Sequence, residues 1–333
     1  MRVGGRTFDI GPPAVCWAIL MMAASIASSA APAAEYPARP IRFVVPFAAG
    51  GTSDIIGRIL SARMQDSLGQ SLVVDNRGGA GGSIGTDIVA KANPDGYTLV
   101  LGSNGTHAIV PYLYKSLPYD PIKDFTPVSM VAITPTVLAC NPDLPVRSVK
   151  ELIALAKSKP GALAYGSSGV GSTTHIAGET LAVMAGIQLN HVPYKSASAA
   201  YPDVFSGRVA LIFDTALSML QHIKAERVRP LAVTTPARAG NVPNVPTLAE
   251  AGVPGYAITL WIAIYAPANT PAPIVARLNK EIQRALTLPE VREQMALQGA
   301  DIAVGSPADL LAATRSDLKR MGEIVKAAHI EPQ

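Results

Sequence analysis

The chain has 333 residues, of which 49% are hydrophobic and 16% are charged. This length allows about two domains with cores of their own, and the apolar content excludes a chain that is disordered throughout. The formal net charge of +4 comes from lysines and arginines that are scattered along the chain, which excludes the basic runs typical of nucleic-acid-binding proteins.

The first 34 residues have the pattern of a secretory signal peptide. Arg2 and Arg6 precede the apolar run AVCWAILMMAASIA, and small residues follow in SSAAPAAEYP. A basic start, a short apolar stretch and small residues at its end are the three parts of such a signal. We therefore predict export with cleavage between Ala30 and Ala34, the alternative being an uncleaved anchor. No second long apolar segment follows, so the mature chain is expected to be soluble.

The mature chain is expected to keep one cysteine. Cys16 lies within the signal and should be removed with it, which leaves Cys140. One thiol cannot form a disulfide within the chain, and the sequence places no base beside it. We predict that Cys140 is a small buried side chain and that a large core, rather than disulfides, stabilises the protein.

After the signal, short runs rich in β-branched residues alternate with helical patterns. Strands are predicted at 41–47, 72–76 and 98–103. An apolar stripe predicts a helix over 55–68. A second helix is predicted over Ser83–Ala92, with these side chains facing inward: Ile84, Ile88 and Val89. Such alternation is typical of a parallel sheet with helices packed on its faces.

A proline-rich segment separates this unit from a second one. Its β-like run, 128–139, is interrupted by Pro135, and because a proline is poor inside a central strand, we predict that the run crosses between two lobes. The alternation then restarts, with strands predicted at 163–168, 189–195, 209–215 and 228–235. A second crossing is predicted at 257–267. Two long helices, Pro271–Leu286 and Pro307–Ala327, are then predicted to return to the first lobe.

These patterns predict an α/β protein of two lobes, each a parallel or mixed sheet with helices on both faces. The predicted boundaries are 35–134 plus 262–333 for a discontinuous lobe 1, and 135–261 for lobe 2. Open α/β sheets bind ligands at the carboxyl ends of their strands. We therefore expect a ligand cleft between the lobes.

Three strand ends carry residues suited to hold an anion. In PFAAGGTSD, 46–54, glycines permit close approach of a ligand, and the amides of the following helix start favour a negative group. In GSSGVGSTTH, 166–175, hydroxyls and amides gather at a strand-to-helix junction. GSNGTH, 102–107, adds polar side chains from lobe 1. Each stretch alone also fits an ordinary helix cap, so the anion-binding interpretation depends on their pairing across the cleft.

Two further side chains stand at strand ends of lobe 2. Lys195 is suited to pair with a ligand anion and Asp214 with an amine, the alternative being surface residues beside the cleft. The predicted ligand-binding residues are Phe47, Ala48, Ala49, Gly50, Gly51, Thr52, Ser53, Asp54, Ser103, Asn104, Thr106, Ser167, Ser168, Gly169, Gly171, Ser172, Thr173, His175, Lys195 and Asp214.

The sequence lacks the signatures of several enzyme classes. It has no G-x-x-x-x-G-K-[ST] phosphate loop, GGAGGSIG at 78–85 does not have the G-x-G-x-x-G spacing, and GSSG does not form a G-x-S-x-G elbow. The five histidines lack metal-ligand spacing. We therefore predict no catalytic residue, no metal and no cofactor. An exported serine hydrolase that uses Ser168 or Ser172 with His175 is the alternative.

Long ordered motifs run along essentially the whole chain after the signal. They are YPARPIRFVVPFAAGGTSDIIGRILSARMQDSLGQSLVVDNRGGAGGSIGTDIVAKANPDGYTLVLGS, LPYDPIKDFTPVSMV, YGSSGVGSTTHIAGE, HVPYKSASAAYPDVFSGRVALIFD, LAVTTPARAGNVPNVPTLAEAGVPGY and APANTPAPIVARLNKEI. In this order they resemble the substrate-binding proteins of tripartite tricarboxylate transporters, the Bug-type family. The match of so many motifs in order makes the resemblance specific.

The resemblance implies a periplasmic, monomeric receptor with the two-lobed type II fold of periplasmic binding proteins. In the family, the loop after the first strand and the serine-glycine loop of lobe 2 hold a ligand carboxylate through amides, hydroxyls and water. Here these loops are 47–54 and 167–173, with 103–106 beside them. The resemblance implies a di- or tricarboxylate, an aromatic acid or an acidic amino acid as ligand, delivered to the subunits of a membrane permease. A sensor that presents its closed form to a membrane kinase is the alternative.

Overall fold

The computed structural model describes residues 4–5, 36–47, 49–194, 196–327 and 332. The chain divides into two compact units, Met1–Ala38 and Arg39–Gln333, and the helices and strands described below lie in the second. Most of the predicted signal peptide, including its cleavage site, lies outside the described residues, as do Ala48 and Lys195. Within the described part of the chain, no helix has both the length and the apolar character needed to cross a membrane.

The first sheet combines strands from both ends of the second unit. Its order is β11-β4-β10-β3-β1-β2 among the described residues. The strands are β1 (Ile41–Val45), β2 (Leu72–Asn76), β3 (Thr98–Ser103), β4 (Phe125–Thr134), β10 (Leu260–Pro267) and β11 (Asp301–Ile302). β1 pairs in parallel with β2 and β3, as the alternation predicts, whereas β10 is antiparallel to both β3 and β4. The sheet is therefore mixed.

Helices pack on this sheet through the stripes that the sequence predicts, with two corrections. They are α2 (Thr52–Leu68), α3 (Ser83–Ala90), α8 (Ala272–Thr287), α9 (Pro289–Leu297) and α10 (Pro307–Ala327). Ile84 was predicted to face inward, but it is half-exposed on the first turn of α3, where Thr86 and Val89 form the buried side instead. The sequence analysis also missed α9, which starts at Pro289 and buries Val291 and Met295.

The second sheet has helices on both of its faces, as predicted. Its order is β7-β6-β8-β5-β9, with parallel pairs at β6 and antiparallel pairs at β5. The strands are β5 (Thr136–Cys140), β6 (Ala164–Ser167), β7 (Asn190–Pro193), β8 (Leu211–Thr215) and β9 (Arg229–Val233), and the helices are α4 (Val149–Ser158), α5 (Thr173–Ala185), α6 (Tyr201–Phe205) and α7 (Ala216–Lys224). Leu138 and Cys140 pack with α4 and α5, and Val137 and Ala139 pack with α6 and α7.

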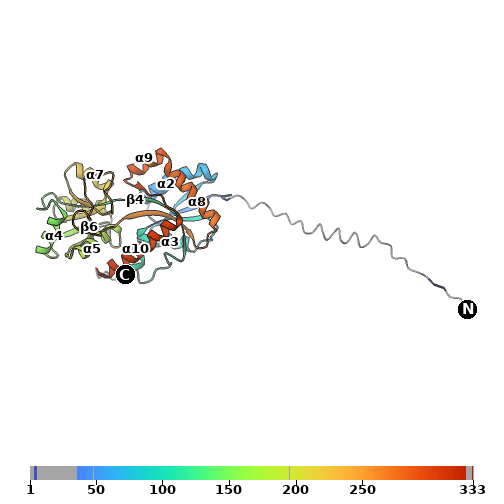
Figure 1. The fold of residues 1–333 in the computed structure, drawn as a ribbon, viewed down its shortest axis with the longest axis horizontal. Coiled ribbons are helices and arrows are strands. Elements are labelled where there is room, and N and C mark those ends of the chain that lie inside the picture. The colour runs from blue at the N-terminus through green and yellow to red at the C-terminus, as the bar shows by residue number, and fades with distance from the viewer. Residues whose placement is uncertain (1–3, 6–35, 48, 195, 328–331, 333) are drawn as a thin grey trace. The chain divides into compact units, whose positions relative to one another are not determined.

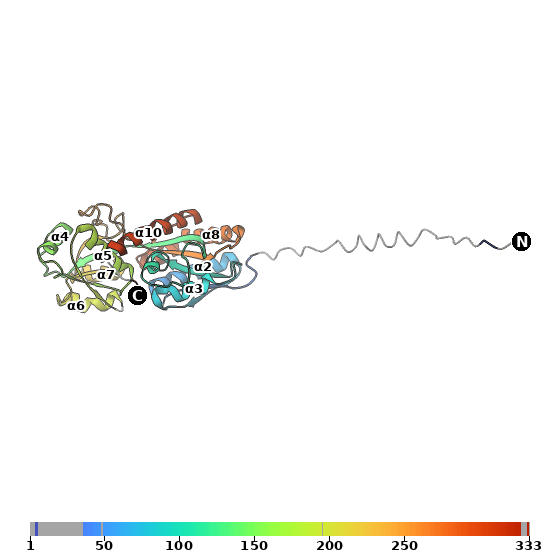
Figure 2. The same ribbon diagram turned by 90° about the horizontal axis from the view of Figure 1, so that it is seen from below.

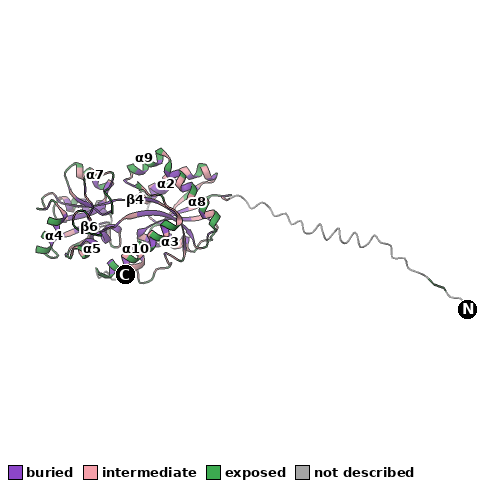
Figure 3. Cartoon of the chain, in the orientation of Figure 1, coloured by how far each residue is buried: buried purple, intermediate pink, exposed green. Residues whose placement is uncertain are grey.

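Short helical turns connect these elements. They are η1 (Ala80–Gly82), the π-helical turn η2 (Gly105–Ile109), η3 (Val110–Tyr112) and η4 (Ala197–Ala200). Cys140 is fully buried, as predicted, and burial raises the pKa of its thiol to about 11. The interior of both sheets is buried, while exposed residues lie on the outer faces of the helices (Figure 3).

The chain crosses between the two sheets at the predicted places. Pro135, which has no amide hydrogen to donate, lies at the break that divides the predicted run 128–139 into β4 of the first sheet and β5 of the second. On the return, the Ile258 amide donates to the Thr234 carbonyl beside β9, and β10 of the first sheet begins at Leu260. The exact boundaries of the two lobes stay a prediction.

Helix α10 lies along the place where the two halves meet (Figures 1 and 2). It contacts β4 and η2 on one side and α5 on the other. Two buried hydrogen bonds join it to β10: Trp261 Nε1 donates to Asp317 Oδ2 at 2.6 Å, and Tyr265 Oη lies 2.7 Å from Thr314 Oγ1. These contacts fix the returning strand to the C-terminal helix.

The Trp261–Asp317 contact yields a test of this packing. Asp317→Ala would leave the buried indole N–H without an acceptor, which costs on the order of 1–3 kcal/mol. Asp317→Asn keeps an oxygen acceptor and should cost less. We expect the unfolding temperature, followed by circular dichroism, to fall clearly more for Asp317→Ala than for Asp317→Asn. Equal losses for the two variants would contradict a role for this hydrogen bond.

Candidate functional site

The loop between β1 and α2 ends at a helix start that has no side-chain cap. Gly51 is the N-cap residue in an extended conformation, and no side chain of this cap accepts a hydrogen bond from the first turn. The first amides of a helix have no partner within the helix, and here they belong to Thr52, Ser53 and Asp54. These donors and the positive end of the helix dipole favour a negative group at this position.

Asp54 supports this loop through its own carboxylate. Oδ2 accepts from the Gly50 amide at 2.8 Å, Oδ1 accepts from Asn76 Nδ2 at 3.0 Å, and Arg58 Nε lies 3.0 Å from Oδ1. The Arg58 hydrogen bond holds the pKa of the Asp54 carboxyl below its usual value, and the bonds from Gly50 and Asn76 act in the same direction. A direct ligand contact by Asp54 stays a prediction, because its described contacts join the loop to α2 and β2.

The glycine-rich segment before α3 packs closely against the same loop, a role that the sequence analysis missed. A Cβ atom on Gly82 would lie 2.7 Å from Thr106 Cγ2 and 3.3 Å from Phe47 Cζ, and one on Gly85 would lie 2.9 Å from Pro46 Cα. A run of glycines at a helix start marks close backbone approach as well as ligand binding. In the sequence, GGAGGSIG was compared only with the spacing of dinucleotide-binding loops, so this packing role was not predicted.

The residues after β3 connect the first sheet to the second-lobe loop. Asn104 is buried, and its Nδ2 donates to the Thr259 carbonyl at 2.9 Å. Its Oδ1 accepts from the Gly105 amide at 3.0 Å and lies 3.3 Å from Thr173 Oγ1. Asn104 therefore contacts both the segment that leads into β10 and the start of α5.

Ser103, the last residue of β3, and Thr106 in η2 are turned inward. Thr106 Oγ1 accepts from the Ser103 amide at 3.0 Å and lies 2.8 Å from Nδ1 of His107, which is fully buried. The Thr106 side chain is fully buried as well, and Ser103 is almost so. The structure thus uses the Thr106 hydroxyl to shape the turn, so that Asn104 is the member of this set that reaches another loop.

The hydroxyl groups of the loop between β6 and α5 form hydrogen bonds within the loop and with the start of α5. Ser172 is the N-cap of α5, and its Oγ donates to the Gly169 carbonyl at 2.7 Å. Ser168 Oγ lies 2.8 Å from Thr174 Oγ1, which also accepts from the Ser168 amide at 2.9 Å. The amides of Thr173 and Thr174, at the first two positions of α5, have no acceptor within the helix. The donors that this loop can offer to a ligand are therefore chiefly amides.

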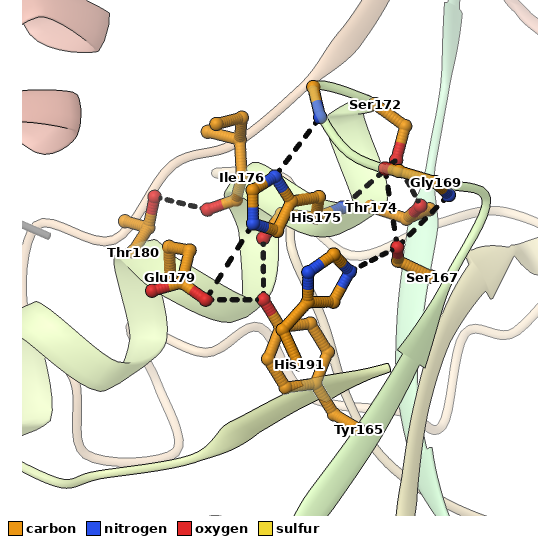
Figure 4. A network of polar contacts seen from close by, with 11 residues as sticks. Tyr165, Ser167, Gly169, Ser172, Thr174, His175, Ile176, Glu179, Thr180 and His191 are labelled. Atoms are coloured by element: carbon orange, nitrogen blue, oxygen red, sulfur yellow. Dashed lines mark hydrogen bonds and ion pairs between the residues drawn. The ribbon is translucent and has the colours of Figure 1, made fainter. Parts of the chain in front are cut away.

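Two histidines lie beneath this loop (Figure 4). His175 Nδ1 accepts from the Gly171 amide at 3.1 Å, and its ring stacks on the ring of His191 with centroids 4.0 Å apart. Nε2 of His191 lies 2.6 Å from Ser167 Oγ. Burial lowers the pKa of His175 to about 3 and that of His191 to about 4, so both rings are neutral at pH 7.

This geometry contradicts the serine hydrolase hypothesis. The hypothesis requires a His175 nitrogen to accept from the hydroxyl of Ser168 or Ser172. Instead His175 Nδ1 accepts from an amide, and the Ser172 hydroxyl donates to the Gly169 carbonyl. The predicted serine–histidine pair is therefore not formed.

Asp214 lies at the carboxyl end of β8, inside lobe 2. Its Oδ2 accepts from Tyr201 Oη at 2.9 Å and its Oδ1 from the Thr215 amide at 2.7 Å. The side chain is 6% exposed, and burial raises the pKa of its carboxyl to about 6. Its role as a partner for a ligand amine stays a prediction.

Three surface cavities of the described chain lie away from these loops. Cavities of about 730, 530 and 640 Å³ lie beside α4 and the segment 238–246, between α8 and the start of α10, and beside the end of α5. None of the three is lined by a residue of 47–54, 103–106 or 167–173. Among the described residues, no group of three or more His, Cys, Asp or Glu side chains is placed to hold a metal. The cleft between the lobes stays a prediction.

Comparisons with known proteins agree with this arrangement. Residues 56–330 match the family model described as tripartite tricarboxylate transporter family receptor. The solved structure of Rpa4515 of R. palustris with adipate is 39% identical, has a TM-score of 0.78 and aligns over 90% of this chain and 100% of that chain. The periplasmic binding protein BugD is 35% identical, with a TM-score of 0.75 and coverage of 90% and 100%. MatC from Rhodopseudomonas palustris with bound malate is 32% identical, with a TM-score of 0.74 and coverage of 87% and 100%.

The raised pKa of Asp214 predicts a pH dependence of stability. Folding penalises the charged carboxylate, so the penalty is absent below the ordinary carboxyl pKa of 3.8, grows as the pH rises and is complete above about 6. Asp214→Asn removes this titration and keeps an acceptor for the Thr215 amide. At about 1.4 kcal/mol per pH unit, the stability of the wild type relative to the variant should fall by about 2.5 kcal/mol between about pH 4 and about pH 8. Urea unfolding at a series of pH values measures this, and a difference independent of pH would contradict the burial of a charged Asp214.

Proposed function

The chain belongs to the tripartite tricarboxylate transporter receptor family, and from this premise we propose that it captures a small dicarboxylate and delivers it to a membrane permease of that transporter type. Receptors of this family are periplasmic solute-binding proteins and not enzymes. The proposed function therefore names a ligand, a binding site and a partner.

The observation that carries the proposal is the uncapped start of α2. Its first amides follow the loop after β1, at the carboxyl end of a parallel strand, where open α/β sheets bind their ligands. Gly50 and Gly51 place no side chain over these amides, and even a Cβ atom added at Gly50 would meet nothing within 4 Å. A carboxylate oxygen suits these donors because they carry partial positive charge and have no acceptor within the helix.

The second contact of the ligand is proposed to come from the start of α5. The amides of Thr173 and Thr174 offer donors of the same kind, and the Thr173 hydroxyl lies against Asn104 of the first lobe. A dicarboxylate would then be held at one end by each helix start. The solved relatives Rpa4515 with adipate and MatC with malate hold ligands of this class, which supports the choice.

Amide donors suit a receptor that must release what it captures. A guanidinium fork would add a full counter-charge and slow release, whereas amides and helix dipoles bind an anion with partial charges. Arg58, the cation on α2 beside the first loop, is already engaged by Asp54 and Asn76. We propose that the two crossings, at Pro135 and before Leu260, are the hinges whose closure presents the loaded form to the permease.

Export and a monomeric state belong to the same proposal. We propose that the signal peptide is cleaved between Ala30 and Ala34 and that the mature chain acts as a monomer in the periplasm. The family of periplasmic receptors supports the location. N-terminal sequencing of the exported protein tests the cleavage site.

A thermal-shift screen of the mature protein tests the ligand class. We expect adipate, malate or another dicarboxylate without an amino group to raise the unfolding temperature more than benzoate, citrate or glutamate, since a ligand at 100 times its Kd adds about 2.7 kcal/mol of stability. The uncharged diamide of adipic acid is the matched control and should give no shift. Stabilisation by a nucleotide with no response to any carboxylate would overturn the proposed function.

The proposed amide contact can be removed without removing a side-chain hydrogen bond. Thr52 is the first residue of α2 and follows an extended Gly51, a position where a proline fits and deletes only the amide hydrogen. Thr52→Pro should weaken dicarboxylate binding by about tenfold or more, because a hydrogen bond to a charged group is lost. Thr52→Ala keeps the amide and should lose less. Isothermal titration calorimetry compares the two, and equal affinities would count against the α2 amides as ligand donors.

A further inference from the structure

A buried polar network underlies the loop that joins β6 to α5 (Figure 4). It contains Tyr165 and Ser167 from β6, His175 and Glu179 from α5, and His191 from β7. Figure 4 shows the two imidazole rings side by side, between the loop and the pair formed by Tyr165 and Glu179. The proposed function leaves these side chains without a role, because its ligand donors are amides of the loop.

His175 closes a reciprocal pair of hydrogen bonds at the start of α5. The Ser172 hydroxyl accepts from the His175 amide at 3.2 Å, and His175 Nδ1 accepts from the Gly171 amide at 3.1 Å. A glutamate or glutamine at the third position of a helix makes the same kind of return contact in a capping box. A histidine can do so only while Nδ1 carries no proton, so the ring proton is on Nε2.

His191 holds the other end of the loop through the Ser167 hydroxyl. Ser167 Oγ accepts from the Gly169 amide at 3.1 Å, lies 3.3 Å from the Gly169 carbonyl and lies 2.6 Å from His191 Nε2. Because a hydroxyl both donates and accepts, this short contact forms with either tautomer of the His191 ring.

The contacts of His175 and His191 hold the loop between β6 and α5 in its backbone conformation. Gly169 and Gly171 both have positive φ values, of 112° and 79°, in a loop that is also closed by the hydrogen bond from the Ser172 amide to the Gly169 carbonyl. The stacked rings, 4.0 Å apart at an interplanar angle of 20°, set the distance between the two anchored ends. Thr173 and Thr174 follow directly after these anchored residues, so the direction of their amides depends on the anchors.

Burial keeps the imidazole rings of His175 and His191 neutral. The titratable groups that face the pair are Glu179, whose Oε1 lies 3.8 Å from His175 Nε2, and Tyr165, whose hydroxyl donates to that oxygen at 2.6 Å and whose ring stacks on His191. Burial raises the pKa of Glu179 and that of Tyr165. A protonated His175 would turn its Nδ1 from an acceptor into a donor that opposes the Gly171 amide.

We propose that the stacked pair His175 and His191 is the positioning element of the ligand loop in lobe 2. His175 Nδ1 holds the Gly171 amide and His191 Nε2 holds the Ser167 hydroxyl, and together they direct the first amides of α5 toward the ligand carboxylate. His175, which the sequence analysis assigned to the ligand, is then a positioning residue. The inference rests on the proposed function for the ligand, but its geometry concerns the protein alone.

Matched variants separate the acceptor from the ring. His175→Leu keeps the apolar volume and removes the acceptor, whereas His175→Gln keeps an acceptor that capping boxes use at this position. His191→Phe keeps a stacked ring and removes the nitrogen that contacts Ser167 Oγ. By calorimetry with adipate, we expect His175→Leu and His191→Phe each to weaken binding by about tenfold, the loss of one hydrogen bond, and His175→Gln to recover most of it. Variants without these nitrogens that bind adipate like the wild type would overturn the proposal.

Nitrogen NMR of the ligand-free wild type provides a readout that needs neither ligand nor variant. The ¹⁵N shift of His175 Nδ1 should be that of an unprotonated nitrogen from about pH 5 to about pH 8. A protonated Nδ1 on His175 in this range would overturn the positioning role even if adipate binds. A wild type with the expected shift that binds no carboxylate would overturn the proposed function and leave the hydrogen-bond geometry established.

Discussion

The chain passes from one sheet to the other at Pro135, and this crossing sets how the fold is partitioned. β4 of the first sheet ends at Thr134, and β5 of the second sheet begins at Thr136. Because β10 brings the chain back to pair with β3 and β4, both crossings lie beside each other in the fold. The carboxyl ends of β1 and β6 each lead into a helix, and a contact between Asn104 and Thr173 connects the two halves at the start of α5.

Partial charges rather than full charges characterise this site. The carboxylate of Asp54 is engaged by Arg58, Asn76 and its own loop, and the buried histidines are neutral because burial lowers their pKa values. Among the described residues of the candidate loops, the groups that remain for the proposed anion are backbone amides, whose positions depend on the loops that present them. An anion held in this way depends on loop geometry more than on any single side chain, so the residues that shape the loops matter as much as those that touch the ligand.

The sequence predicted the parts of the site that depend on local order, and missed those that depend on distant neighbours. Glycines and hydroxyls between a strand and a helix indicated both loops, because this pattern is continuous in the chain. The stacking of His175 on His191 could not be read, since the two residues lie on different elements, the helix α5 and the strand β7. The inward direction of the hydroxyls was missed for the same kind of reason: Thr174 reaches Ser168 only when the loop folds back. Ile84 fits the apolar stripe of α3 in the sequence, but it lies half-exposed on the first turn of that helix.

The contact between Asn104 and Thr173 suits a junction that opens and closes. At 3.3 Å it is a long hydrogen bond between neutral groups, and Asn104 Oδ1 has a second donor in the Gly105 amide. When this bond is lost on opening, each side chain keeps another partner or gains contact with water, so the free-energy cost of losing the bond is small. By contrast, the amide of Asn104 stays bonded to the Thr259 carbonyl, in the segment that leads into β10. The proposed hinge before Leu260 is therefore fastened to the first lobe by the same residue that touches the second. Under the proposed function, a ligand that adds donors and acceptors across this junction would change the balance between open and closed forms with little opposing free energy.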